Sequence, residues 1–221
     1  MNLSHGILPD HLNAIAAVLF ALGLALALWR APWGYLREER NLHVFLGACV
    51  ALMLMWTVRG MTIPGLGYHY FGATLLTLMF GWQLALLGIS VVLVGTVLNH
   101  SGDWLSLPVN GLVMGALPIA VSHFLWRFSE RRLPNNYFVY VFVCAYFGAA
   151  FAFLAAALAA SGLLLVGTHP NPEQLFSEFF PLVFLMAFPE AFITGFVISL
   201  LAVYRPAWVR TFADERYIKG K

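Results

Sequence analysis

Residues 71–98 read FGATLLTLMFGWQLALLGISVVLVGTVL, an apolar run whose course decides the topology of the whole chain. Gly81 and Trp82 divide it into Phe71–Phe80 and Trp82–Leu98. The first part extends only about 15 Å at 1.5 Å per residue, whereas a full crossing of the bilayer needs roughly 17–25 residues. We therefore predict that this part is a short or broken helix, placed where protein or a water-filled cavity shields its exposed backbone.

The division at Gly81 follows from the basic residues, which concentrate on the cytoplasmic side of membrane proteins. Eleven of the twelve fall in three groups: one follows Leu12–Trp29, one follows Leu107–Trp126, and one forms the C-terminal tail. They are Arg30, Arg37, Arg40, Arg127, Arg131, Arg132, Arg205, Arg210, Arg216, Lys219 and Lys221, and the exception is Arg59. The three groups share one side only if residues 71–98 cross the membrane and return.

The composition is that of a membrane protein. Of the 221 residues, 61% are hydrophobic and 10% are charged, against about 25% charged in an ordinary soluble domain. A soluble domain of this size buries only about 70% of the surface that its chain exposes, so lipid is expected to cover the remaining apolar surface. We predict further spans at Leu12–Trp29, Leu42–Val58, Leu107–Trp126, Tyr137–Val166 and Phe179–Tyr204.

Together these segments predict an all-α integral membrane protein, a bundle of about seven transmembrane segments. The N-terminus is expected outside and the C-terminus inside. Residues 1–221 would form one polytopic membrane domain, with residues 1–11 as an external segment inserted into the bundle and residues 205–221 as a cytoplasmic tail. Six of the seven tryptophans then fall at or just beyond span ends, as an interfacial aromatic belt requires.

The histidines gather on the side opposite to the basic residues. In this topology His5, His11, His69, His100 and His169 lie outside. Neutral imidazole is the commonest metal ligand and binds nickel, cobalt, copper and zinc; the alternative is that loop histidines are simply tolerated at a wet surface. His5 lies in an uncharged N-terminal segment and His69 directly precedes the broken helix, where unwound backbone could line a cavity.

Four stretches resemble a known family. The opening MNLSHGILP is similar, without gaps, to the Met-His-Ile-x-(Asp/Glu)-Gly-(Ile/Tyr)-Leu-Pro start of the CbiM-like cobalt/nickel-type substrate-binding membrane subunits of energy-coupling factor transporters. The stretches that follow it in the same order are HYFGATLLTLMFGWQLALLG from residue 69, NHSGDWLSLPVNGLVMGALP from residue 99 and FPEAFITGFVISLL from residue 188. The resemblance covers most of the chain.

The resemblance implies a ligand set for a transported divalent metal ion. In the family the ion is held outside by the N-terminal amine, the second-position histidine and a later histidine; the amine maps to Met1 and the later histidine to His69. The second position is Asn2 here, and His5 replaces the family's acidic residue. We therefore expect Met1, His5 and His69 as metal ligands. Second candidates, as ligands or on the route into the site, are Asn2, His11 and His100.

The function implied is that of the substrate-capture and permease subunit that imports a divalent transition-metal ion, cobalt or nickel, across a bacterial inner membrane. The chain contains no G-x-x-x-x-G-K-[ST] phosphate-binding loop, so ATP hydrolysis is expected in a separate subunit. As a transporter subunit, the chain itself is expected to be no enzyme and to bind no permanent cofactor. Its expected partners are a scaffold membrane subunit, ATPase subunits that hydrolyse ATP, a small accessory membrane protein and the lipid bilayer, but no nucleic acid.

Two alternatives come from other classes of protein. The chain could be a non-transporting membrane subunit that assembles or stabilises another membrane complex, which the replacement at Asn2 favours. It could also be a haem-binding electron-transfer subunit, if His43 and His123 face each other near the cytoplasmic side.

Glu190 lies near the middle of the last predicted span, beside Pro189. An ionisable group at membrane depth is costly and usually faces a cavity or a partner. We expect either a hydrogen-bonding role inside the bundle or a role in transport, at a depth well below the outer cavity.

Overall fold

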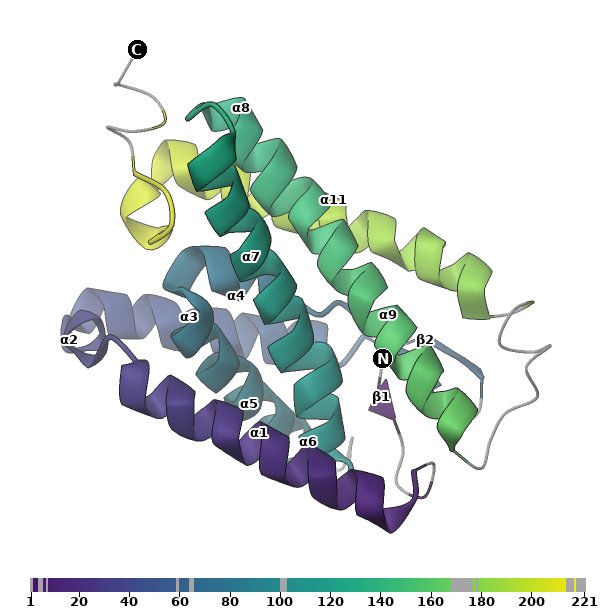
Figure 1. Ribbon diagram of the computed structural model, residues 1–221. Helices are drawn as coiled ribbons and strands as arrows, with labels where there is room; N and C mark the ends of the chain where they lie inside the picture. The colour runs from purple at the N-terminus through teal and green to yellow at the C-terminus, as the bar shows by residue number, and fades with distance from the viewer. Residues whose placement is uncertain are drawn as a thin grey trace.

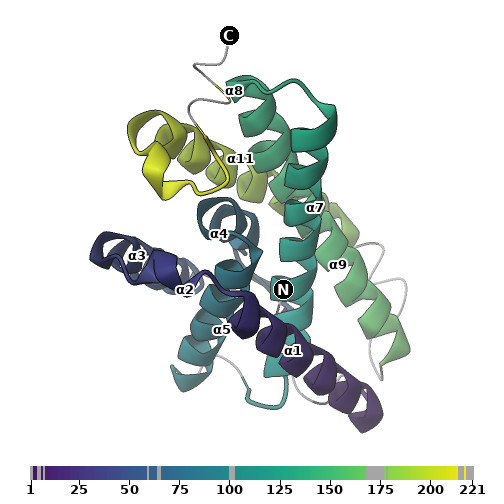
Figure 2. The ribbon, with the colours of Figure 1, turned by 60° about the vertical axis from the view of Figure 1, so that its left-hand side comes forward.

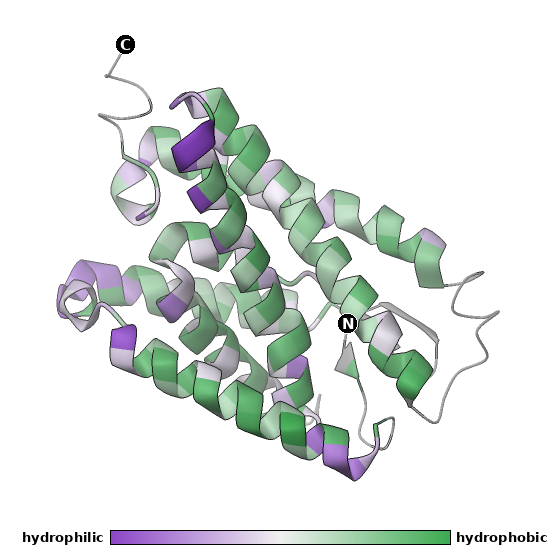
Figure 3. Cartoon of the chain, viewed as in Figure 1, coloured by the Kyte–Doolittle hydropathy of each residue, from purple (hydrophilic) through white to green (hydrophobic). Residues whose placement is uncertain are grey.

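Long apolar segments form helices in this chain because a backbone in lipid must satisfy its hydrogen bonds within the segment. The computed structural model describes residues 2–3, 6, 8–58, 60–63, 66–99, 103–167, 177, 179–213 and 217. Its described part is a bundle of helices (Figure 1). Hydrophobic residues cover most of each helix, and hydrophilic ones gather at helix ends (Figure 3).

The described residues of the first half form five helices and three short strands. They are β1 (Asn2–Leu3), α1 (Asp10–Arg30), α2 (Trp33–Leu36), α3 (Glu39–Met55), β2 (Gly60–Ile63), β3 (Leu66–Tyr68), α4 (Ala73–Phe80) and α5 (Trp82–Leu98). The strands form one small antiparallel sheet in the order β1-β3-β2.

The described residues of the second half form three long helical segments and a final turn. The first runs through α6 (Leu107–Asn110), the π-helical η1 (Gly111–Ala116) and α7 (Leu117–Arg132), and the second through α8 (Tyr137–Val139), the π-helical η2 (Tyr140–Phe147) and α9 (Gly148–Val166). The third is α11 (Phe180–Tyr204), followed by the 3-10 turn η4 (Pro206–Trp208).

Four of these segments are long and apolar enough to cross a membrane. They are Asp10–Arg30, Leu107–Arg132, Tyr137–Val166 and Phe180–Tyr204, and Trp82–Leu98 is a shorter apolar helix. The general prediction of an all-α membrane bundle is therefore confirmed, with a small three-stranded sheet added. The number of seven crossings and the side on which each terminus lies stay predictions.

The apolar run breaks where the sequence analysis placed the break. Helix α4 ends at Phe80 and α5 begins at Trp82, and Gly81 between them adopts φ 84° and ψ 163°. These angles are open to glycine and essentially closed to other residues. Helix α4 is the innermost helix, in contact with α5, α7, η2, α9 and α11, so its short backbone is shielded by protein.

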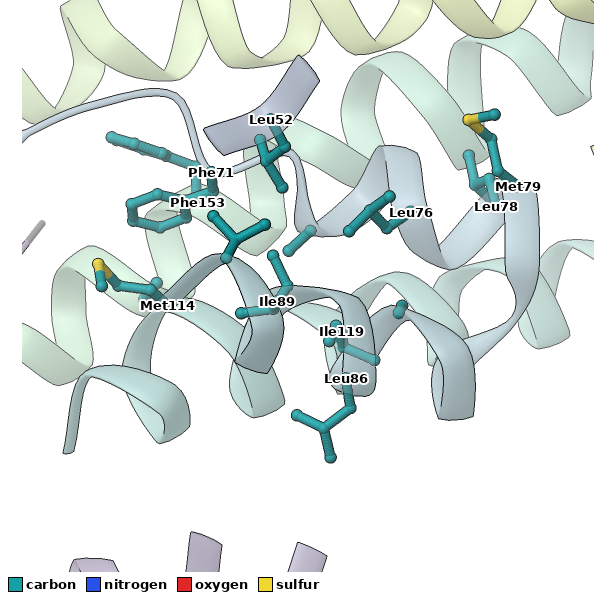
Figure 4. Close-up of a cluster of buried hydrophobic side chains, with 14 of the residues drawn as sticks. Leu52, Phe71, Leu76, Leu78, Met79, Leu86, Ile89, Met114, Ile119 and Phe153 are labelled. Atoms are coloured by element: carbon teal, nitrogen blue, oxygen red, sulfur yellow. The ribbon is translucent and has the colours of Figure 1, made fainter. Parts of the chain in front are cut away.

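Side chains from four elements meet around the start of α4. Figure 4 shows Leu52 of α3, Phe71, Ile89 of α5 and Phe153 of α9 in one apolar cluster, each at most 4% exposed. The rings of Phe71 and Phe153 pack with centroids 4.9 Å apart. This cluster fixes the lead-in segment, which we define as residues 69–72, between the sheet and α4.

The three basic groups come together at one end of the bundle. The guanidinium of Arg210 lies 5.8 Å from the ring of Tyr35 in α2, and the ring of Phe212 lies 6.3 Å from that of Tyr137, at the start of α8. In Figures 1 and 2 the C-terminal turn likewise lies near α8. The described parts of the three groups thus lie at neighbouring elements, and the side of the membrane on which they lie stays a prediction.

Candidate metal site

The imidazole of His69 is buried among aromatic rings directly after strand β3. It is 8% exposed, and its centroid lies 4.3 Å from the Trp56 ring and 5.8 Å from the Phe71 ring. Trp56, at the end of α3, also donates from its indole N–H to the carbonyl of Phe71 at 3.4 Å. Both ends of the lead-in segment are therefore held against α3.

The backbone orients the ring of His69. Its Nδ1 lies 3.1 Å from the carbonyl oxygen of Tyr70. Since a carbonyl can only accept, Nδ1 carries the proton in this contact, and a neutral ring then has its lone pair on Nε2. Metal-binding histidines usually donate their second N–H in this way, because the contact fixes both the tautomer and the ring orientation.

The beginning of the chain is held beside the strand that leads to His69. Strand β1 pairs antiparallel with β3, with Asn2 opposite Gly67 and Leu3 opposite Leu66. Asn110 holds this segment from the other side: its Oδ1 accepts from Leu3 N at 2.8 Å, and its Nδ2 donates to the Leu3 carbonyl at 3.0 Å. Leu3 is 2% exposed.

A narrow pocket connects these residues. Its wall contains His69, Trp56, Asp103, Ser106, Asn110 and Met114, together with apolar residues of α5. Imidazole, carboxylate and thioether groups are all ligands of transition metals. Within the described ranges, however, no group of three or more His, Cys, Asp and Glu side chains could hold a metal ion. Among these four residue types, the described part of the chain therefore offers His69 no complete ligand set.

Glu190 approaches the lead-in segment from α11. Its side chain is 3% exposed; Oε2 accepts from Phe71 N at 2.7 Å and Oε1 accepts from Gly72 N at 3.0 Å. The predicted interior hydrogen bonding is thus present, but Glu190 bonds to backbone within three residues of His69. Its depth relative to the outer cavity stays a prediction.

The opposite end of α4 is held by the C-terminal segment. The backbone N–H of Arg210 donates to the Met79 carbonyl at 2.9 Å, and Arg210 Nη1 donates to the Phe80 carbonyl at 3.2 Å. The Thr211 hydroxyl donates to the Leu78 carbonyl at 2.7 Å. A carboxylate therefore sits at the N-terminus of α4 and a guanidinium at its C-terminus, the arrangement that the helix dipole favours.

The predicted ligands are described only in part. Met1 and His5, like the second candidate His100, lie outside the described residues. Asn2 is described in its backbone, within β1, and His11 is exposed in the first turn of α1. His69 lines the pocket described above.

Two residues near His69 were not among the candidates. Trp56 contacts the imidazole, and Asn110 holds Leu3. The sequence could have indicated Asn110, which lies inside the predicted span Leu107–Trp126. A polar side chain within a span is costly unless it forms hydrogen bonds.

The structure places the two haem-ligand candidates in different surroundings. His43 lines a groove between α3, α4 and α11. The ring of His123 on α7 lies 5.4 Å from that of Trp126. The haem alternative requires the two rings to face a common space, which these surroundings do not suggest.

The sequence of the chain matches one known protein family. Residues 2–208 match the family model CbiM, described as the cobalt uptake substrate-specific transmembrane region. No individual curated protein matches the chain.

Two solved structures share the fold. One is titled a transition metal transporter: it is 19% identical, the alignment covers 92% of this chain and 93% of that one, and the TM-score is 0.78. A truncated transition metal transporter is 20% identical, with 92% and 99% covered and a TM-score of 0.76.

Proposed function

The chain belongs to the CbiM family of cobalt uptake substrate-specific transmembrane regions, and from this membership we propose that it captures a divalent cobalt or nickel ion for an energy-coupling factor transporter. It is a membrane protein and a component of a metal-uptake transporter. The single observation that carries the proposal is the buried imidazole of His69, oriented by the Tyr70 carbonyl and lining a pocket beside the start of the chain.

We assign the ion to Met1, His5 and His69. The Asn110–Leu3 hydrogen bonds and the β1–β3 pairing hold the chain beginning beside the strand before His69. Because Leu3 is already fixed, an amine one residue before this strand would have fewer residues to order when it binds the ion. His5 would supply the imidazole that the family's second residue supplies and Asn2 does not.

A membrane topology and partner subunits complete the proposed transporter. We propose seven membrane segments with the N-terminus outside and the C-terminus inside, in a bacterial inner membrane. Scaffold, ATPase and accessory subunits would couple ATP hydrolysis to release of the ion inward. The arginines gathered at one end of the bundle support docking of such subunits on that side.

Metal content tests the proposal directly. The protein with its native N-terminus is purified in detergent, offered cobalt, nickel, copper and zinc separately, and the bound ion is quantified. Wild type is expected to hold about one ion, and His69→Ala and His5→Ala to lose it. His123→Ala is the matched control, since His123 packs on Trp126 of α7 and does not line the pocket.

Two other outcomes would count against the proposal. If wild type binds none of the four ions, the metal site does not exist and the assembly subunit, which Asn2 favours, becomes the better proposal. If binding persists in both histidine variants, the assigned ligands are wrong.

A further inference from the structure

A groove runs along the bundle between α3 on one side and α4 and α11 on the other. Helix α3 packs on α5 and α2, whereas α11 packs on α4, η2 and α9, and the space between α3 and α11 is open. The groove has a volume of about 700 Å³, which lies within the roughly 300–1,000 Å³ of typical ligand pockets.

The two ends of the groove differ in chemistry. Apolar side chains of α3, α4 and α11 form its walls, with Gly47 and Ala51 on α3 and Val197 on α11 among them. At one end it is lined by Arg40 and His43, and by Trp208 of η4. Tryptophan and arginine are typical of the membrane–water interface, where lipid head groups lie.

The guanidinium of Arg40 is suited to a phosphate at this end. Its one ion pair in the described structure is with Glu38 at 3.9 Å, and both side chains are about two thirds exposed, 67% and 65%. Pairs with this geometry contribute little. An arginine can bind two phosphate oxygens at once, and basic pockets between transmembrane helices are known as head-group sites.

The far end of the groove is closed by protein. Leu52 of α3 packs so closely on Gly72 that a Cβ there would lie 2.6 Å from Leu52 Cδ1. The hydroxyl of Tyr70 is 2.9 Å from Thr194 Oγ1 and links the lead-in segment to α11. A partner helix that crossed the whole membrane would meet this closure, whereas an acyl chain can end below it.

The length of the groove also suits an acyl chain. On α3 it extends from Arg40 to Met55, about 22 Å at 1.5 Å per residue. One leaflet contributes about half of the roughly 30 Å hydrocarbon core. The groove is therefore longer than the hydrocarbon part of one leaflet is deep, so an acyl chain of one leaflet fits along it from the interface inward.

We propose that this groove binds one anionic phospholipid, with its phosphate at Arg40 and His43 and an acyl chain between α3 and α11. The chain end would contact Leu52 and Gly72 of the closed end. Gly72 belongs to the lead-in segment that Glu190 also binds, so the lipid supports the backbone next to His69. The site is separate from the pocket proposed for the metal ion.

Native mass spectrometry tests the proposal on the detergent-purified full chain. Phosphatidylglycerol or phosphatidylcholine with identical acyl chains is added, and bound lipid per protein is counted. Wild type is expected to retain one phosphatidylglycerol, at least several-fold more than phosphatidylcholine. Arg40→Gln is expected to remove this preference, and Arg132→Gln, which changes an arginine on another helix, is expected to keep it.

A groove-filling variant tests the acyl-chain position. A Cβ on Gly47 would meet nothing within 4 Å, and the same holds for Gly162 on α9. Leucine at either position favours the helix, so both variants should fold. Gly47→Leu is expected to reduce lipid retention about tenfold, while Gly162→Leu leaves it unchanged.

Three results would overturn the proposal. The first is equal retention of both lipids by wild type, and the second is full retention in Gly47→Leu. The third is a Gly47→Leu variant that keeps its lipid but no longer co-purifies with the other transporter subunits, which would assign the groove to a partner helix. Metal binding by the same samples reports on the proposed function separately.

Discussion

The carboxylate of Glu190 lies 2.7 Å from the backbone nitrogen of Phe71, although the two residues are 119 positions apart in the sequence. The same carboxylate also accepts from Gly72 N, so Glu190 satisfies two N–H groups just before the first turn of α4. Such groups have no partner within the helix itself. An ionisable residue in the middle of α11 thus holds the backbone that carries His69.

The first prediction concerns Glu190→Gln. The amide keeps the size of the side chain, but only one of its two terminal atoms can accept, so one buried N–H loses its partner at a cost of about 1–3 kcal/mol. The negative charge at the helix N-terminus is lost as well. We expect a lower Tm in detergent and weaker metal binding. Glu39→Gln, on the surface of α3, is the control, and equal Tm values for the two variants would contradict this role.

The second prediction concerns Asn110→Ala, which removes both hydrogen bonds to Leu3. Each such bond contributes about 0.5–1.5 kcal/mol net, so the chain beginning should be ordered less often and metal affinity should fall by about tenfold, as 1.4 kcal/mol implies. Isothermal titration calorimetry with the ion that wild type binds measures the change. Asn135→Ala, in the exposed connection before α8, should bind as wild type does. Unchanged affinity in Asn110→Ala would show that this side chain does not position the ligands.

Much of the fold was predictable because a backbone in lipid must satisfy its hydrogen bonds within its own segment, which restricts spans to long apolar helices. The predicted segment Tyr137–Val166 has the bounds of α8, η2 and α9 together, and Phe179–Tyr204 differs from α11 by one residue. The break at Gly81 followed from the positions of the basic residues, which do gather at one end. These features depend on length, hydropathy and charge along the chain.

The contacts around His69 were not predictable in the same way. Glu190–Phe71 and Asn110–Leu3 each join residues more than 100 positions apart, so they depend on how the helices pack. Glu190 and Asn110 are both polar residues inside predicted spans, and a sequence does not show which backbone groups such residues bond. The position of Glu190 in α11 did not reveal its partners, because these belong to the lead-in segment, which lies 118 and 119 positions away in the sequence.

The third prediction concerns Thr211→Val at the other end of α4. Valine matches threonine in shape but loses the hydroxyl, which donates to the Leu78 carbonyl at 2.7 Å and lies 2.6 Å from the Tyr140 hydroxyl. We expect a loss of about 1–3 kcal/mol, because two buried partners lose a bond. Thermal unfolding in detergent, compared with Ser199→Ala on the exposed part of α11, measures it. A Tm equal to that of Ser199→Ala would mean that the Thr211 hydroxyl does not hold α4.

The last prediction compares one substitution at two glycines. Gly81 has φ 84° and ψ 163°, and a Cβ there would lie 3.3 Å from Arg210 Nη1. Residues other than glycine are strained in this region by about 1–3 kcal/mol, so Gly81→Ala should lower the Tm. Gly162 lies inside α9 with open space around its Cβ position, and alanine is favoured over glycine in a helix by roughly 0.5–1 kcal/mol. Gly162→Ala should therefore raise the Tm or leave it unchanged. Both Tm values are measured in the same detergent. A lower Tm for Gly81→Ala only would show that the break between α4 and α5 depends on a backbone conformation that only glycine adopts readily. Equal Tm values for the two variants would mean that α4 and α5 can be joined in another way.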